Sequence, residues 1–493
     1  MDSRTAFVFD NTFARELKGL HVAWRPAAVR APALLFLNQD LAQDLGLELE
    51  ALDDDTLAAI FSGNRVPEGA EPIAQAYAGH QFGHYSPRLG DGRAVLLGEV
   101  LDRTGQRRDL MLKGSGRTPF ARNGDGRAAV GPMLREVLIG ESLHALGIPA
   151  TRALAVAATG EAVMRERPLP GAVLTRVASS HLRVGTFEFA AMGGTRDDLA
   201  QLADYTIARH FPAFVGVPDR VLRLLQGVCE RQAALIARWM NVGFIHGVMN
   251  TDNMAISGES IDFGPCAFLE AYDPAAVFSS IDERGRYAFG NQPDMALWNL
   301  ARFAEALLPL IDASPERAAG LATEVLEGFP EAYRAKRLEG LRAKLGLATI
   351  DADDAALAQD WLALLEAQRV DFTLAWRRLA DAAAGDETAL RALFGEGVAL
   401  TAWLARWRAR CDAEAIPAAA RAAAMRGVNP FVIARNHRVE EALSAASDRG
   451  DLIAFERLLL ALRRPFDEDA DLAPYGEPAR AEVTACYKTY CGT

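Results

Sequence analysis

Residues 244–270 of this chain, FIHGVMNTDNMAISGESIDFGPCAFLE, bring a histidine, an Asp-Asn pair and an Asp-Phe-Gly into one short stretch. Asn253 follows His246 by seven residues, and Asp262 opens the Asp-Phe-Gly. The segment between them, MAISGESI, predicts two short strands around a turn at residues 257–259, which would bring Asn253 and Asp262 side by side. An amide oxygen and a carboxylate suit a hard cation such as Mg²⁺. The stretch therefore predicts a divalent metal site.

The order and spacing of these residues resemble the catalytic and metal loop of protein kinases. In that loop an aspartate two residues after the histidine is the base, and this chain has Val248 there. An aliphatic side chain cannot accept a proton. The nearest replacement is Asp252, directly before Asn253. The loop therefore either lacks a catalytic base or uses Asp252 in its place. Each piece occurs by chance in turns, but the three in this order favour a functional loop.

A lysine and two glycine-rich loops precede this stretch. Residues 90–93 read Gly-Asp-Gly-Arg and are followed by strand-like AVLLGEVL and DLMLKGSG, of which the second carries Lys113. Residues 124–127 repeat Gly-Asp-Gly-Arg. Glycines let the backbone approach phosphate closely, and a lysine supplies a point charge for it. A lone Gly-x-Gly is usually only a hairpin turn, but two such loops flanking one lysine favour a phosphate pocket.

A helix is predicted after the second loop. The segment GPMLREVLIGESLHALG has apolar residues at helical spacing and ends before Ile-Pro. A kinase-like small lobe needs a helix glutamate to hold the lysine, and Glu136 is the first candidate. Glu141 is its competitor, and either could instead be a solvated carboxylate. The segments TRALAVAATG, EAVMRER and GAVLTRVASS then predict three strands that continue an antiparallel sheet.

Positive charge is concentrated in the region of these loops. Residues 88–183 contain 15 Lys/Arg and 9 Asp/Glu, although the whole chain carries a net charge of −12. Arg176 and Arg183 close this run and could hold a polyphosphate by forked hydrogen bonds. As isolated arginines they would more often be surface residues.

Composition excludes several other classes of protein. A net charge of −12 argues against nucleic acid or an anionic membrane as the main partner, and we find no 18-residue apolar run. The first residues have no apolar core long enough for a signal peptide, so the expected compartment is the cytoplasm. His80 and His84 are four residues apart, but nearby Gly and Pro disfavour a helix and no third ligand is evident, so we expect no zinc site.

Several motifs together resemble one family over the full length of the chain, the selenoprotein O (YdiU) family of kinase-like protein adenylyltransferases. The motifs are YAGHQFGHYSPRLGDGRA, LKGSGRTPFARNGDGRA, HGVMNTDN, DFGPCAF, NPFVIARNH and a cysteine third from the end, Cys491. In some members of that family the third-from-last residue is selenocysteine. The absence of the kinase base aspartate at Val248 is a difference from kinases that the family shares.

The resemblance implies a role for each candidate residue. ATP would lie reversed relative to a kinase, with Lys113, Arg176 and Arg183 on its outer phosphates and Glu136 paired with Lys113. Asp252 would be the base, and Asn253 and Asp262 would hold Mg²⁺ or Mn²⁺. The residues implied around the nucleotide are Gly90, Gly92, Arg93, Asp125, Gly126 and Asp262.

The implied activity is transfer of AMP from ATP to Ser, Thr or Tyr hydroxyls of protein substrates, with release of pyrophosphate. The residues themselves support a magnesium nucleotide site in a kinase-like fold, whereas transfer of AMP rests on the resemblance. A catalytically inactive pseudokinase that binds nucleotide and a protein kinase remain alternatives, and UTP could replace ATP.

The expected fold is α+β and bilobal, like a protein kinase, with a mainly β small lobe and a helical large lobe. We expect an N-terminal extension over residues 1–75, with helices capped by Asn38 and Asp53. The small lobe would span residues 76–195 and the large lobe residues 196–320. A helical C-terminal region would cover residues 321–493 and end in a redox-candidate tail.

The five cysteines do not make a disulfide framework. We nevertheless expect that Cys491 can form a disulfide with Cys266, which lies two residues after the Asp-Phe-Gly glycine. A tail thiol beside the metal loop could couple activity to redox state by restraining that loop. Two reduced thiols are the alternative, and Cys486 could replace either partner.

Overall fold

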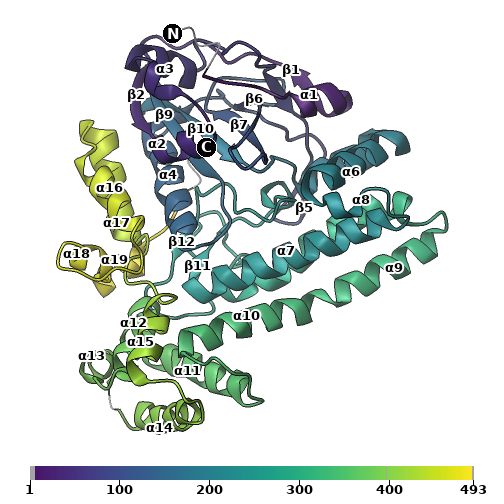
Figure 1. Cartoon of the computed structure of the whole chain (residues 1–493). Helices are drawn as coiled ribbons and strands as arrows, with labels where there is room; N and C mark the ends of the chain where they lie inside the picture. Colours follow the sequence, from purple (N-terminus) through teal and green to yellow (C-terminus); the bar gives the residue numbers. More distant parts are fainter. Residues whose placement is uncertain (1–5, 396, 491–493) are drawn as a thin grey trace.

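Eight strands from residues 21–178 form one antiparallel sheet (Figure 1). The computed structural model describes residues 6–395 and 397–490. The strands lie in the order β1-β3-β6-β7-β10-β9-β2, and β8 pairs with β10. Their bounds are β1 His21–Ala23, β2 Ala33–Leu37, β3 Ile73–Gln75, β6 Ala94–Leu101, β7 Arg107–Lys113, β8 Ala128–Ala129, β9 Arg152–Met164 and β10 Pro168–Ala178.

Strand β9 corrects one expectation from the sequence, because TRALAVAATG and EAVMRER are one strand and not two. The glycine between them, Gly160, has φ 68° and lies at an irregularity where the register with β10 shifts between Pro170 and Ala172. A glycine tolerates that left-handed conformation, so the strand bends there without ending.

The sheet separates two apolar cores. Leu110 and Met111 are neighbours on β7 but belong to different buried clusters, as expected when successive side chains point to opposite faces. One face is covered by α2 (Gln39–Asp44) and α3 (Asp54–Phe61), and the other by α4 (Val130–Ala145). The caps of α2 and α3 are confirmed: the side chains of Asn38 and Asp53 accept hydrogen bonds from Leu41 N and Thr56 N.

Long helices form the layer below the sheet in Figure 1. Helix α7 packs against α8, α9 and α10, and it ends at Gly243, whose φ of 77° allows the chain to turn into β11, which pairs antiparallel with β12. The bounds here are α1 Thr12–Glu16, β4 Gly79–Gln81, β5 His84–Ser86, α5 Val184–Gly193, α6 Arg196–His210, α7 Arg220–Val242, β11 Phe244–Ile245, β12 Ala267–Phe268, α8 Gln292–Ile311, α9 Pro315–Glu327 and α10 Phe329–Leu345.

The remaining helices complete the chain. Helices α16 and α17 pack on α4, beside the sheet in Figure 1. Their bounds are α11 Asp354–Gln368, α12 Phe372–Ala383, α13 Thr388–Ala392, α14 Val398–Asp412, α15 Ala418–Arg426, α16 Asn436–Arg449, α17 Ile453–Leu462, α18 Ala473–Gly476 and α19 Ala481–Cys486. None of the helices in the described part of the chain is long and apolar enough to cross a membrane.

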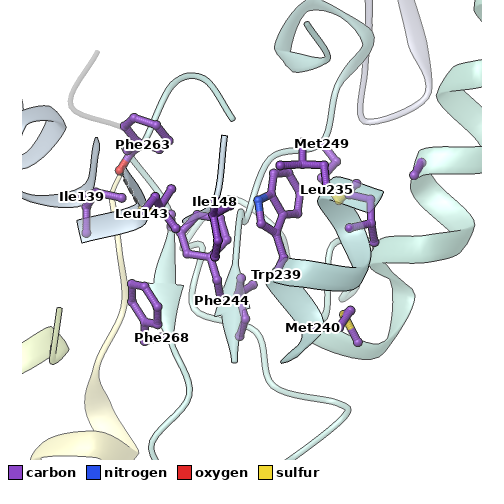
Figure 2. Close-up of a cluster of buried hydrophobic side chains, with 14 of the residues drawn as sticks. Ile139, Leu143, Ile148, Leu235, Trp239, Met240, Phe244, Met249, Phe263 and Phe268 are labelled. Carbon is purple, nitrogen blue, oxygen red and sulfur yellow. Dashed lines mark hydrogen bonds between the residues drawn. The ribbon is translucent and has the colours of Figure 1, made fainter. Parts of the chain in front are cut away.

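A buried core joins the sheet with its helix α4 to the long helices (Figure 2). Figure 2 shows Ile139 and Leu143 of α4 near Phe263, the phenylalanine of the Asp-Phe-Gly, with Trp239 of α7 beyond Ile148. The Trp239 indole donates a hydrogen bond to Ser260 Oγ at 2.9 Å. Packing on both sides therefore fixes the loop that carries Asp262.

Candidate functional site

A cavity of about 700 Å³ lies between the sheet and the segment that joins β11 to β12. It is lined by twelve of the residues singled out in the sequence: Gly90, Gly92, Arg93, Lys113, Asp125, Gly126, Glu136, Arg176, Arg183, Asp252, Asn253 and Asp262. Val248 also lines it. Residues from positions 90 to 262 thus meet around one space.

Asp262 is the point on which the cations of the cavity converge. Its Oδ1 lies 2.5 Å from Lys113 Nζ and 2.7 Å from Arg176 Nη1, and its Oδ2 lies 3.7 Å from Arg183 Nη1. Burial alone would raise the pKa of Asp262, but these three positive charges hold that pKa well below its usual range. Asp262 also has φ 66°, a left-handed conformation that is uncommon outside glycine and that clusters at functional sites.

Lys113 is held from behind by Glu136. Its Nζ donates to Glu136 Oε1 at 2.7 Å, and the same oxygen accepts a hydrogen bond from Phe263 N at 3.3 Å. The competitor Glu141 instead binds Arg152, at 2.8 and 2.9 Å. Of the two glutamates on α4, Glu136 is therefore the one that contacts the lysine.

Arg183 precedes α5 and is buried. Its Nη1 donates to the main-chain oxygen of Asp252 at 3.0 Å, and its guanidinium lies over the Tyr77 ring, 4.4 Å from the centroid. Asp91 is 3.9 Å away. These contacts attach the cation to the segment that carries Asp252, so the phosphate-binding and catalytic candidates are physically linked.

Asp252 has a carboxylate that is only partly satisfied. Its Oδ2 accepts a hydrogen bond from Gln81 Nε2 at 3.3 Å, whereas its Oδ1 is buried and has no hydrogen-bond partner among the described residues. Burial raises the pKa of this group to about 6. Asp252 lines the cavity, and a carboxylate with a pKa raised in this way can accept a proton from a bound hydroxyl.

Asn253 and Asp262 fit a hard divalent cation. Asn253 Nδ2 donates to Val248 O at 3.0 Å, which leaves its Oδ1 available, and Asp262 Oδ2 lies 3.7 Å from Arg183 Nη1. The described residues contain no group of three or more His, Cys, Asp or Glu placed to hold a metal. Two protein oxygens suit Mg²⁺ or Mn²⁺, because Mg²⁺ usually takes its other ligands from water and substrate phosphates.

The glycines of the two loops are required by close packing as well as by the cavity. Gly90 has φ 63°, and a Cβ there would lie 2.3 Å from the Phe120 ring. Gly126 has φ 71°, and a Cβ would lie 2.2 Å from Arg117 N. Asp125 is ion-paired with Arg165 at 2.7 Å. Both glycine-rich loops therefore pack against the same segment, residues 116–121, which connects them at the edge of the cavity.

The turn between the metal candidates differs from the expected hairpin. Ala255 and Ser260 do not pair with each other; Ala255 bridges to Arg183 and Ser260 to Ala150. The alternation of apolar and polar residues in MAISGESI predicted two paired strands, but the backbone of this segment bridges to distant segments of the chain. Gly258, with φ 79°, makes the turn.

One element with contacts to the site was not predicted: the hairpin of β4 and β5. His80 N donates to Thr251 Oγ1 at 2.7 Å, and Phe82 N donates to Asn250 Oδ1 at 3.0 Å. With the Gln81 contact, three consecutive residues thus bind residues 250–252. The two histidines were weighed only as zinc ligands, and His80 in fact contacts Glu188 at 2.5 Å.

Cys266 is buried beside the cavity, and its thiol contacts Phe263 O at 3.1 Å. Burial raises the pKa of this thiol to about 11. Cys491 lies outside the described residues, but the tail comes close: Thr489 Oγ1 donates to Pro265 O at 2.6 Å.

We therefore keep the prediction that Cys266 and Cys491 form a disulfide in oxidised protein. Because burial disfavours the Cys266 thiolate, the bond should form slowly. Peptide mapping under non-reducing conditions checks this, with Cys229, a buried thiol in α7, as the residue expected to stay reduced. Recovery of Cys266 only as a free thiol after oxidation would contradict the prediction.

Comparison with known proteins gives one consistent result. The family model described as "Protein adenylyltransferase SelO" matches residues 6–463. A protein of Chromobacterium violaceum named "Protein nucleotidyltransferase YdiU" is 61% identical over 479 residues, which cover 96% of this chain and 99% of that protein. Proteins with the same name from Cereibacter sphaeroides and Rhizobium etli are 58% identical over 488 residues and 56% identical over 491 residues, each covering 99% of this chain.

Proposed function

This chain belongs to the SelO family of protein adenylyltransferases and is a nucleotidyltransferase, and we propose that it transfers AMP from ATP to a Ser, Thr or Tyr hydroxyl of a protein and releases pyrophosphate. The observation that carries the proposal is the arrangement around Asp262. Lys113, Arg176 and Arg183 converge on its carboxylate, and Asp252 lines the same cavity.

We also propose that the fold corresponds to a protein kinase, with the sheet and α4 as the small lobe and α6 to α8 as part of the large lobe. The support is the pairing of a strand lysine with a helix glutamate, Lys113 with Glu136, above an Asp-Phe-Gly. The lobe boundaries given from the sequence remain part of this proposal.

The outer phosphates of ATP would bind to Lys113, Arg176 and Arg183. The two arginines are buried, with 2% and 3% of their surface exposed, so their positive charges are poorly screened by water. In the protein alone both arginines contact Asp262, and Arg183 also lies 3.9 Å from Asp91. A polyphosphate offers these cations more negative charge than one carboxylate, and forked guanidinium contacts suit it.

Asn253 Oδ1 and Asp262 Oδ2 would hold the divalent metal. When bound, Mg²⁺ or Mn²⁺ would neutralise charge that develops on the phosphate oxygens and on the leaving pyrophosphate. The chain's own contribution is to fix these two oxygens: Val248 O holds the Asn253 amide, and Lys113 and Arg176 hold the other oxygen of Asp262.

Asp252 would act as general base. In the proposed step the substrate hydroxyl oxygen forms a bond to the α-phosphorus, the bond from that phosphorus to the pyrophosphate oxygen breaks, and the hydroxyl proton moves to the Asp252 carboxylate. Burial poises this carboxylate near neutrality, which suits proton transfer. Val248, the position of the kinase base, lines the cavity as an aliphatic side chain.

Parallel incubations with α-labelled and γ-labelled ATP test which phosphorus is attacked. We expect label to enter protein from the α position only, because Lys113 and Arg176, two of the three cations that would hold the outer phosphates, lie on strands β7 and β10 and contact Asp262. The readout is radioactivity in protein bands, and the Asp262→Ala variant is the blank. Parallel reactions with α-labelled UTP, and with Mn²⁺ in place of Mg²⁺, compare the possible substrates and metals.

Label from the γ position alone would make the protein a kinase and overturn the proposal. Binding of ATP without label from either position would instead favour a pseudokinase that regulates a partner.

A further inference from the structure

Arg176 has a contact on the side away from the cavity that the proposed reaction does not use. Its three guanidinium nitrogens have different partners: Nη1 donates to Asp262 Oδ1 at 2.7 Å, Nη2 contacts Met111 Sδ at 3.5 Å, and Nε donates to His181 Nε2 at 3.2 Å. The histidine therefore fixes the guanidinium from behind and leaves its Nη1 edge toward the cavity.

The contact determines the protonation state of His181. An arginine Nε is always a donor, so His181 Nε2 must be the unprotonated acceptor. Its Nδ1 then carries the proton and donates to Asp109 Oδ2 at 2.9 Å. The main-chain N of His181 donates to the same oxygen at 2.8 Å. Burial lowers the pKa of His181 to about 4, so the ring stays neutral.

A buried ion-pair network holds Asp109 in turn. Arg209 on α6 contacts Asp109 Oδ1 and donates to Glu99 Oε1 at 2.8 Å. Glu99 also accepts a hydrogen bond from Thr12 Oγ1 at 2.9 Å. The side chains of Asp109, His181 and Glu99 are at most 1% exposed. Because the chain of contacts runs from α1 through β6, β7 and α6 to His181, the imidazole has one defined orientation.

We propose that His181 is a positioning residue for nucleotide binding, a neutral acceptor that orients Arg176 without neutralising its charge. A carboxylate in the same place would hold the arginine equally well but would cancel the charge that a phosphate needs. Asp109, the carboxylate that orients the ring, is itself compensated by Arg209. The inference rests on the proposed function only in that Arg176 binds a phosphate of ATP.

A matched pair of substitutions separates positioning from packing. His181→Asn keeps an N–H near the Nδ1 position for Asp109 but removes the acceptor for Arg176, whereas His181→Gln can present an oxygen near the Nε2 position. We expect about tenfold weaker Mg²⁺-ATP binding by calorimetry for His181→Asn, since a hydrogen bond to a charged group is lost, and a value near wild type for His181→Gln. His210→Asn is the control, because His210 is a half-buried histidine bound to Ser180 and has no hydrogen bond with Arg176.

Histidine-selective ¹⁵N NMR of the wild-type protein gives a second measurement that needs neither activity nor a folded variant. We expect a neutral His181 ring protonated at Nδ1. A proton at Nε2, equal loss of affinity in the Asn and Gln variants, or an unchanged affinity in His181→Asn would each overturn the inference. Wild-type protein that binds ATP but transfers no α label would overturn the proposed function alone, because this comparison uses binding.

Discussion

Replacing Asp262 with alanine is expected to abolish metal-dependent ATP binding and to reduce AMP transfer on the order of 10³-fold or more, since a catalytic metal supplies several kcal/mol of charge stabilisation. The substitution removes one of the two proposed metal oxygens. It also removes the counter-charge on which Lys113, Arg176 and Arg183 converge. The measurement is ATP affinity by calorimetry, with Mg²⁺ and with chelator, alongside turnover.

ATP affinity measured without metal distinguishes the two roles of Asp262, as a metal ligand and as the counter-charge of the three cations. With the carboxylate gone, Lys113 keeps Glu136 and Arg183 keeps Asp91 at 3.9 Å, whereas Arg176 loses its carboxylate partner. The cavity therefore gains uncompensated positive charge, so free ATP should still bind in chelator, and adding Mg²⁺ should not tighten it. The same uncompensated charge should lower the unfolding free energy by about 3–5 kcal/mol. Asp262→Asn keeps the shape of the side chain and one oxygen, so its metal-dependent ATP affinity should lie between those of the wild type and the alanine variant. Undiminished Mg²⁺-ATP affinity in the alanine variant would refute the metal assignment.

The elements that the sequence predicted best are those specified by local pattern. Helix α4 follows from its apolar spacing, and the caps at Asn38 and Asp53 follow from side chains that bond the backbone three residues on. Lys113 and Glu136 are 23 residues apart, on a strand and the helix after it, so their contact could be anticipated from a short segment.

Contacts between distant segments could not be anticipated. His80 and Thr251 are 171 residues apart, and Arg176 and Asp262 are 86 apart, so no local periodicity reports on either pair. The same reason explains why the turn at Gly258 was mispredicted. The alternating residues on either side of it form backbone bridges with the distant residues Arg183 and Ala150, and not with each other. His181 carried no signal at all, because a lone histidine between a strand and a helix is more often a packing residue.

Substitution of Asp252 is expected to affect turnover and ATP affinity very differently. We expect Asp252→Ala to reduce turnover by on the order of 10²-fold or more while leaving ATP affinity nearly unchanged, as loss of a general base predicts. Affinity should survive because Arg183 donates to the main-chain oxygen of Asp252, which the substitution keeps. Calorimetry and single-turnover transfer of α label measure the two quantities independently.

The isosteric variant and a surface control decide what a loss at Asp252 means. Asp252→Asn keeps the shape of the side chain and an oxygen for Gln81, but its amide is not a base, so it should be nearly as inactive as the alanine variant. Asp204→Asn removes a carboxylate from the exposed face of α6, where it pairs with Arg220, and should retain wild-type turnover. If Asp252→Asn restored turnover, the carboxylate would act only by shape. If affinity and turnover fell together, Asp252 would belong with Asp262 to the metal site, and the hydroxyl proton would have to leave by another route.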